Sequence, residues 1–337
     1  MSAPMYGRTV WSIARRAWGA PPPRVRRATS AGWDARLLVT VLVLASLAPV
    51  DARAGDADAC AGPLALQVLG SGGPDTAQGR ASSGYLLRID GRGRALVDAG
   101  AGVQVALGRA GVEFADLRWI ALSHLHVDHA ADLVAILKAG YFSERTTPLP
   151  LFGPIQGGVF PSLDQYVQRL LGDSGAYAYL SGYLDGSDGL VALQPHAVAA
   201  QQVSLLLDED GIRLEALAVP HGPVPALAYR ITVGARRIVL AGDTTAADDA
   251  LIAFARDADL LVMHLAIAES AESAARGLHA LPSRIGEVAA AVAPRRLVLS
   301  HLMARSLAQL PEALRRIRAR YRGPVQVAQD GLCVPLK

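Results

Sequence analysis

Cysteine is scarce in this chain, and so are apolar runs long enough to cross a membrane. The 337 residues include 2 cysteines, Cys60 and Cys333, and their wide separation excludes the C-x-x-C motifs of redox and zinc-binding proteins. The apolar run at residues 37–50 is shorter than the roughly 20 residues that a membrane-spanning helix needs. These absences favour a globular protein over a thiol redox module or an integral membrane protein.

The chain also lacks a basic surplus once its N-terminal segment is set aside. Its formal net charge is +3, but residues 1–54 hold eight arginines against Asp34 and Asp51, a net charge of +6. Residues 55–337 therefore carry a net charge of −3. Nucleic-acid binders usually present a basic surface, so the charge argues against a nucleic-acid partner and favours a small-molecule substrate.

Residues 1–54 are typical of an export signal. An arginine-rich segment precedes the apolar run, and Ala52-Arg53-Ala54 matches a small-x-small cleavage site. We therefore expect a cleaved leader, no stable membrane span after cleavage, a periplasmic or secreted protein, and one domain over residues 55–337. The sequence leaves open that the leader stays attached as an anchor.

The two cysteines lie near opposite ends of the exported part. Chain termini often lie close together in a domain, and disulfides persist in oxidising compartments. We therefore expect a disulfide between Cys60 and Cys333. The alternative is one buried thiol and one exposed thiol.

Hydrophobic periodicity predicts an α/β fold. Strands are expected at residues 64–69, 83–89, 94–97, 117–122, 202–207, 212–218, 226–232, 237–241, 260–263, 296–299 and 325–327, and helices at 103–110, 131–139, 162–171, 246–256, 283–291 and 311–321. The elements form two similar halves, which favours a four-layer αββα sandwich over a doubly wound sheet. Between the halves, residues 141–200 are rich in Gly, Pro and Tyr, and we expect a variable insert or lid there.

The segment Ser123–His129 is the strongest functional signal. It holds three of the chain's 8 histidines and one carboxylate in the pattern H-x-H-x-D-H, and imidazole and carboxylate are preferred ligands of Zn²⁺. His124 and His126 can point the same way along an extended loop. Asp128 and His129 would open the helix expected near Ala130, where a carboxylate suits the helix N-terminus. The pattern predicts a metal site.

Three more polar residues follow apolar strands farther along the chain: His221, Asp243 and His301. Residues just beyond buried strands are held by a rigid scaffold, so functional sites collect there. With the first loop they provide two sets of three ligands, namely His124, His126 and His221, and Asp128, His129 and His301. Asp243 is then available as a carboxylate that bridges two metal ions.

These motifs resemble the metallo-β-lactamase superfamily, and are most similar to its ribonuclease Z-like branch. The matching segments are Leu69–Pro74, Asp98, the H-x-H-x-D-H loop, Phe152-Gly153-Pro154, His221, Gly242-Asp243-Thr244 and Ser300-His301. The resemblance implies the metallo-β-lactamase fold and two Zn²⁺ per chain, with Mn²⁺ or Fe²⁺ as alternatives. It also implies that Asp98 orients the ligand histidines, that Asp128 steers the attacking hydroxide, and that His279 protonates the leaving group.

Three departures from the ribonuclease Z-like pattern bear on the substrate. Leu265 stands where that pattern has a Glu after the histidine at His264, and Ala280 replaces the Ser or Thr after His279. Only about twenty residues separate His221 from Asp243, too few for the arm with which transfer-RNA-processing members grip RNA. Together with the expected export and the net negative charge of residues 55–337, these departures argue against transfer-RNA maturation. Separately, we expect His264 to support the ligands rather than bind metal.

The sequence thus predicts an exported dinuclear-zinc hydrolase, with phosphodiesterase action on a small phosphoester as the main interpretation. One alternative is a lactonase or β-lactamase-type hydrolase of a cyclic ester or amide. A ribonuclease Z-like nuclease and a non-catalytic metal-binding sensor module are the others. The resemblance is also compatible with a homodimer, although no interface can be read in the sequence.

Overall fold

The structure is a computed structural model, and it describes residues 60–337. The expected leader lies outside the described residues, so its cleavage and export stay predictions. Among residues 60–337, no helix has both the length and the apolar character needed to cross a membrane.

Seven strands form the first sheet, in the order β14-β1-β2-β3-β4-β5-β6. They are β1 (Leu64–Gly70), β2 (Gly84–Ile89), β3 (Arg92–Val97), β4 (Trp119–Ala121), β5 (Leu149–Pro154), β6 (Leu193–Val198) and β14 (Cys333–Pro335). The strands from β14 to β3 pair antiparallel, and those from β3 to β6 pair parallel. The carboxyl ends of β3, β4 and β5 therefore lie along one edge of the sheet.

The second sheet mirrors this arrangement with the order β13-β12-β11-β10-β9-β8-β7. Its strands are β7 (Ser204–Glu209), β8 (Ile212–Val219), β9 (Ala226–Val233), β10 (Arg236–Leu240), β11 (Leu260–His264), β12 (Arg296–Ser300) and β13 (Val325–Val327). The strands β10 to β13 pair parallel. Such strands need crossover connections, and helices supply most of them.

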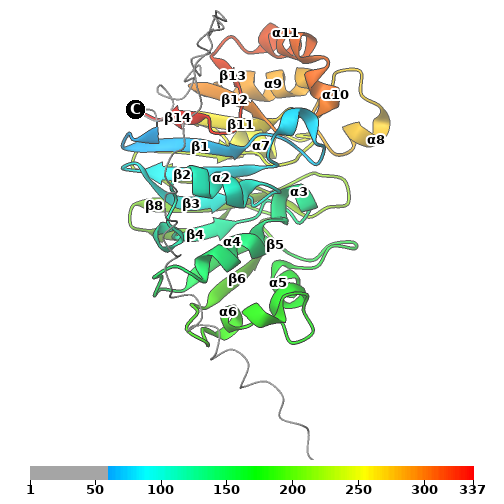
Figure 1. The fold of residues 1–337 in the computed structure, drawn as a ribbon. Coiled ribbons are helices and arrows are strands. Elements are labelled where there is room, and N and C mark those ends of the chain that lie inside the picture. The colour runs from blue at the N-terminus through cyan, green and yellow to red at the C-terminus, as the bar shows by residue number, and fades with distance from the viewer. Residues whose placement is uncertain (1–59) are drawn as a thin grey trace, which may run out of the picture. The chain divides into compact units, whose positions relative to one another are not determined.

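Helices cover the outer faces of the two sheets (Figure 1). The helices beside the first sheet are α2 (Val103–Arg109), α3 (Val127–Ala130), α4 (Leu133–Gly140), α5 (Leu163–Leu171) and α6 (Gly182–Asp185). Those beside the second are α7 (Ala250–Phe254), α8 (Ser273–Arg276), α9 (Pro282–Val292), α10 (Ala304–Leu307) and α11 (Leu310–Arg320). One apolar core fills the space between the sheets and one more lies under each helix layer. The expected αββα sandwich is confirmed.

Residues 141–200 differ from the expected insert or lid. They supply β5 and β6, which extend the first sheet, and α5 packs on that sheet through Leu163, Val167 and Leu171. The helix expected at 162–171 is thus present, but as part of the core. Both strands contain proline, and β5 also contains glycine. These residues weaken the sequence signal of a strand, although strands at or near the edge of a sheet tolerate them.

The expected disulfide is present. Cys60 is bonded to Cys333, with their Cα atoms 5.4 Å apart. Cys333 belongs to β14, which pairs with β1 and places Cys333 opposite Gln67. Sequence reasoning missed β14, a three-residue strand that ends in proline and pairs only with β1 at the edge of the sheet.

Candidate metal centre

The expected ligands gather at one edge of the sandwich, on the right in Figure 1 near the labels α3, α8 and α10. The H-x-H-x-D-H loop follows β4, and His221, Asp243 and His301 follow β8, β10 and β12. The parallel strands β10, β11 and β12 end at this edge together, as β3, β4 and β5 do in the other sheet. The fold therefore brings together every ligand that the sequence proposed.

The first ligand set forms a tight group of imidazole nitrogens. His126 Nδ1 lies 3.0 Å from His124 Nε2 and 3.3 Å from His221 Nε2. Asp243 Oδ2 lies 3.9 Å from His124 Nε2 and 3.7 Å from His221 Nε2. These four residues converge on one point.

The second set lies on the other side of Asp243. His301 Nε2 is 3.0 Å from Asp128 Oδ2, and His129 Nε2 is 3.6 Å from the same oxygen. Asp243 approaches this set as well, with Oδ2 at 3.7 Å from His129 Nε2 and Oδ1 at 3.5 Å from His301 Nε2. Asp243 is therefore within 4 Å of both sets, as a bridging carboxylate must be.

Hydrogen bonds behind the ligands fix which ring nitrogen faces the centre. His221 Nδ1 donates to the carbonyl oxygen of Leu278 at 2.7 Å. His129 Nδ1 donates to Asp98 Oδ2 at 2.8 Å. Because a carbonyl or carboxylate oxygen can only accept, each Nδ1 carries a hydrogen, and Nε2 is the ring nitrogen left to face the centre.

Asp98 anchors the H-x-H-x-D-H loop. Its carboxylate accepts hydrogen bonds from the Ser123 amide at 2.7 Å and the Ser123 hydroxyl at 2.9 Å, besides that from His129. The Ser123 hydroxyl, having given its hydrogen to Asp98, can accept one from His124 Nδ1 at 3.1 Å. The hydrogen bond expected between Asp98 and a ligand histidine is therefore present.

The charges of the site suit a cation. Burial lowers the pKa of His124, His126 and His221, which keeps these imidazoles neutral. Burial opposes ionisation of Asp243, but the facing His301 and His129 outweigh it and hold its pKa well below the usual value. Likewise His301 and His129 outweigh burial and lower the pKa of Asp128 to about 2.

The donor set passes a test of fit for a metal. His124 Nε2 and His221 Nε2 both present lone pairs to His126 Nδ1, which has at most one hydrogen to give. His129 Nε2 is buried and has no hydrogen-bond partner among the described residues. Buried acceptors that face one another without hydrogens are costly unless a cation lies between them. The nitrogen and oxygen ligands are those that Zn²⁺ binds.

His264 and Tyr85 form a further layer behind Asp243. His264 Nδ1 lies 2.6 Å from Asp243 Oδ1, and His264 Nε2 lies 2.9 Å from the Tyr85 hydroxyl. That hydroxyl also lies 2.9 Å from Ser300 Oγ. Sequence reasoning found His264 but missed Tyr85, because a tyrosine in an apolar strand cannot be distinguished in the sequence from an ordinary core residue.

His279 lies beside both ligand sets. Its Nδ1 is 3.7 Å from Asp243 Oδ2, is buried, and has no hydrogen-bond partner among the described residues. Burial lowers the pKa of His279 to about 3. Leu265, which stands where the ribonuclease Z-like pattern has Glu, is fully buried in the core and offers His279 no polar contact.

Two glycines permit close approach at the centre. A Cβ on Gly73 would lie 2.7 Å from His301 Cε1, so the glycine-rich loop after β1 can pack on this ligand only without a side chain. Gly242 has φ of +63°, and a Cβ there would lie 2.9 Å from the Leu227 carbonyl oxygen. Its left-handed backbone, which favours glycine, directs the next residue, Asp243, into the site.

An apolar rim borders the first ligand set. The Phe160 ring packs edge-on against His126, with ring centroids 5.4 Å apart. Val159 on the same loop is 90% exposed and Val127 is 68% exposed. This loop, residues 155–160, is the part of the expected lid that does approach the site.

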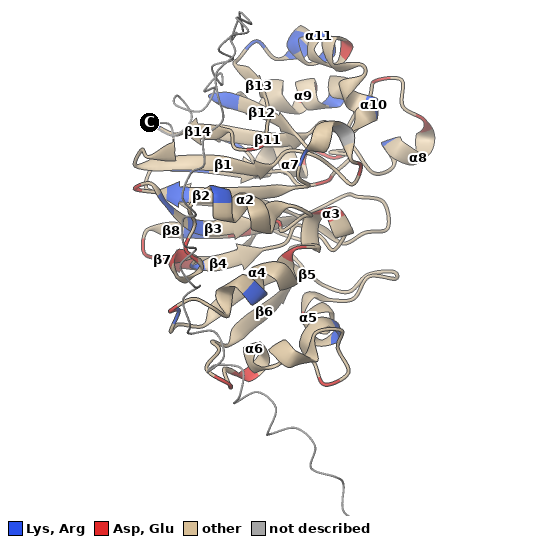
Figure 2. Ribbon diagram, in the orientation of Figure 1, with Lys and Arg blue, Asp and Glu red and all other residues tan. Residues whose placement is uncertain are grey.

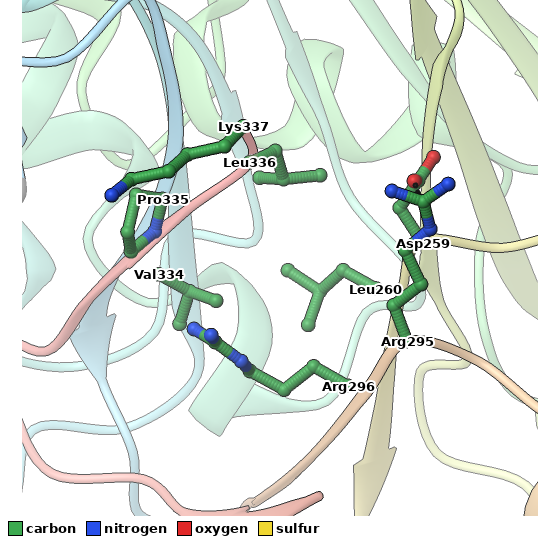
Figure 3. A pocket seen from close by; sticks show the side chains of 8 residues that line it. All are labelled: Asp259, Leu260, Arg295, Arg296, Val334, Pro335, Leu336 and Lys337. Carbon is green, nitrogen blue, oxygen red and sulfur yellow. Dashed lines mark ion pairs between the residues drawn. The ribbon is translucent and has the colours of Figure 1, made fainter. Parts of the chain in front are cut away.

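A separate cavity of about 300 Å³ lies where β11 and β12 begin and the chain ends (Figure 3). It is lined by Asp259, Leu260, Arg295, Arg296, Val334, Pro335, Leu336 and Lys337. None of these is an expected site residue. Because β11 and β12 run from this cavity toward the metal centre, the two lie at opposite ends of the strands.

Comparison with known proteins places the chain among relatives with this fold. Residues 93–302, more than half of the chain, match the family model of the β-lactamase superfamily domain. Ribonuclease Z from Mycobacterium bovis (strain BCG / Pasteur 1173P2) is 32% identical over 204 residues, which cover 59% of this chain and 69% of that protein.

Solved structures show the same architecture. The short form of human tRNase Z superimposes with a TM-score of 0.63 and 20% identity, covering 81% of this chain and 99% of that one. A diphosphatase from the PhnP family superimposes with a TM-score of 0.56 and 16% identity, covering 81% of this chain and 98% of that one. At these identities the superpositions demonstrate the fold alone.

Proposed function

This chain belongs to the metallo-β-lactamase superfamily and is a metal-dependent hydrolase, and from that premise we propose that it is a phosphodiesterase whose substrate class is RNA. The observation that carries the reaction type is His279, a buried imidazole 3.7 Å from the carboxylate that lies between the two ligand sets. Cleavage of a phosphodiester releases an alkoxide, which needs a proton, and a histidine at the edge of the centre can supply it.

We infer that two Zn²⁺ are held at this site. His124, His126 and His221 would bind one, Asp128, His129 and His301 the other, and Asp243 would bridge them. When bound, zinc lowers the pKa of water and stabilises negative charge that develops on phosphate oxygens.

The roles of the chain's own residues follow from their positions. Asp128, with Oδ2 at the inner face of the second set, orients the attacking water and accepts its proton. His279 would give a proton to the leaving oxygen, after the negative charge of the bound phosphodiester raises the pKa that burial holds at about 3 in the free protein. Asp98 holds the loop that carries four of the ligands, so it acts on the reaction through His129 and Ser123.

The relatives favour RNA over the small phosphoester expected from the sequence. The curated relative that is 32% identical is a ribonuclease Z, and the superposed human enzyme is a tRNase Z. The net charge argued against nucleic acid, but it averages over a surface on which charge is unevenly spread. Four arginines lie on α11 against Glu312, and Figure 2 shows this helix among the most basic parts of the described chain.

A small phosphodiester is the second candidate. The strands β9 and β10 form a hairpin joined by the two residues Gly234 and Ala235, which leaves no RNA-gripping arm between His221 and Asp243. One structural neighbour is a diphosphatase. We also propose that the protein is exported to the periplasm or secreted, on the support of its N-terminal sequence and of the disulfide.

Turnover of a substrate panel tests the proposal. The panel contains an RNA with a 3′ extension, bis(p-nitrophenyl) phosphate, a lactone and a chromogenic cephalosporin, each with and without a chelator. We expect chelator-sensitive cleavage of the RNA and of the aryl diester, and a drop of about 100-fold or more in RNA cleavage in His279→Ala. The rate of aryl diester cleavage should fall less in this variant, because nitrophenolate leaves without a proton.

Two results would contradict the proposal. If the lactone or the cephalosporin is the best substrate, the reaction class is wrong. If only small phosphodiesters are cleaved, the second candidate replaces the first. Fractionation of cells that express the full chain tests export, and activity confined to the cytoplasm would disprove it.

A further inference from the structure

The Tyr85 hydroxyl is the polar end of a side chain in the core between the sheets. Tyr85 lies on β2 in the first sheet and is 1% exposed. Its ring packs in the inter-sheet core, and its hydroxyl contacts His264 and Ser300 of the second sheet, each at 2.9 Å. A buried hydroxyl needs such partners, and here both lie directly behind the metal centre.

His264 is in contact with the centre and has the chemistry of a ligand. One of its ring nitrogens lies within 4.8 Å of potential ligand atoms on His129, Asp243 and His301, so that these four residues alone form a group able to hold a metal. Asp128 is the competing third ligand of the same set. The geometry of the cluster by itself does not decide between them.

The hydrogen bond with Tyr85 excludes His264 as a metal ligand. A carboxylate that bridges two metal ions can only accept a hydrogen bond, so His264 Nδ1 carries the hydrogen of their 2.6 Å contact. His264 Nε2 then holds the lone pair, and the Tyr85 hydroxyl donates to it. The Ser300 oxygen lies 2.9 Å from the same Tyr85 oxygen, and because a hydroxyl can both donate and accept, Ser300 can supply the hydrogen of that contact. Both nitrogens of His264 are occupied by protein partners, and neither is free for a metal.

We propose that Tyr85 is a positioning residue that keeps His264 out of the metal coordination sphere and makes it hold Asp243 in the bridging position. Asp243 Oδ1 is held by His264, which leaves Oδ2 directed at His124, His129 and His221. Asp128 then completes the second set without competition. This inference rests on the metal centre of the proposed function, but not on its substrate.

The test compares two buried tyrosines by metal binding. Tyr85→Phe removes the hydroxyl that contacts His264. Tyr183→Phe is the matched control, because Tyr183 is equally buried and its hydroxyl donates to the carbonyl oxygen of Leu137, which is not a ligand residue. Each metal-free variant is titrated with Zn²⁺ by calorimetry and with Co²⁺ by absorption spectroscopy, and its thermal unfolding is followed in chelator.

We expect Tyr85→Phe to bind at least one metal about 10- to 100-fold more weakly, with an altered Co²⁺ spectrum. Tyr183→Phe should match the unmodified protein in both readouts, although both variants lose stability in chelator. If Tyr85→Phe retains wild-type metal affinity and spectrum, the proposal is wrong.

A second variant keeps the test decisive if Tyr85→Phe does not fold. His264→Asn retains a donor for Asp243 but cannot replace an imidazole ligand. The proposal predicts two bound metals and a Co²⁺ spectrum like that of the unmodified protein. Loss of one metal in His264→Asn would show that His264 is a ligand after all. Neither result depends on which substrate is cleaved, so failure here is distinct from failure of the phosphodiesterase assignment.

Discussion

The two sheets supply the metal centre in different ways. The first sheet contributes four ligands from one loop after β4, and one carboxylate, Asp98, anchors that loop. The second sheet contributes His221, Asp243 and His301 from three separate strands. Two of these have identified supports elsewhere, namely the Leu278 carbonyl for His221 and His264 with Tyr85 for Asp243. The first half is locally organised, whereas the second depends on the assembled sandwich.

Asp243 is where the two halves meet, so its removal should have the largest effect. We expect Asp243→Ala to lower the second-order rate constant on the order of 1,000-fold or more and to reduce metal content below two per chain. Metal analysis and initial rates measure both. Asp259→Ala is the control, because Asp259 holds the Arg237 amide at the opposite end of β11. Two retained metals in Asp243→Ala would rule out a bridging role.

Asp98 tests the local organisation of the first half. In Asp98→Ala the Ser123 amide and His129 Nδ1 lose their acceptor, and we expect metal affinity to fall by about 10- to 100-fold. Asp132→Ala is the matched control, because that carboxylate accepts the amides of Gly102 and Gln104 but touches no ligand. Equal losses in both variants would mean that general destabilisation, not ligand orientation, explains the effect.

Gly73 tests the packing of the second half. The added methyl group in Gly73→Ala would press on His301, and a small displacement of this ligand should reduce activity by about 10-fold. Gly108→Ala on α2 is the control, since its Cβ would meet no atom within 4 Å. Calorimetric titration should show one weakened metal and one unchanged. Wild-type rates in Gly73→Ala would show that the backbone of the glycine-rich loop shifts to make room for the methyl group and that His301 stays in place.

The disulfide should have the smallest effect on either half of the site. Replacing Cys60 and Cys333 with serine should lower the free energy of unfolding by about 2–4 kcal/mol in urea titrations, because the unfolded chain is no longer cross-linked. Metal affinity and rates at 25 °C should stay unchanged. A loss of metal in this variant would show that the edge formed by β1 and β14 supports the centre.

The same contrast explains what the sequence could predict. The H-x-H-x-D-H loop could be recognised because its four ligands lie within six residues, whereas His221, Asp243 and His301 could be interpreted only as partners of that loop. Tyr85 gave no signal, since its role depends on His264 arriving from the other sheet.

The fold was predictable where periodicity is strong. The strands β1, β2 and β8 to β12 were expected close to their observed bounds. The strands β5 and β6 were missed because proline interrupts them, and only pairing with β4 makes them part of the sheet. The helix expected over 246–256 is shortened to α7, and Ala246 has a φ of +49°, which lies outside the right-handed helical region.

The bond between Cys60 and Cys333 makes the chain between these residues a covalent ring. A protease that cuts the exposed loop at Val159 would open this ring without releasing a fragment. The nicked protein would migrate as one species on a non-reducing gel and as two pieces after reduction. Tolerance of such a cut next to His126 would also show whether the apolar rim must be continuous for substrate to be held.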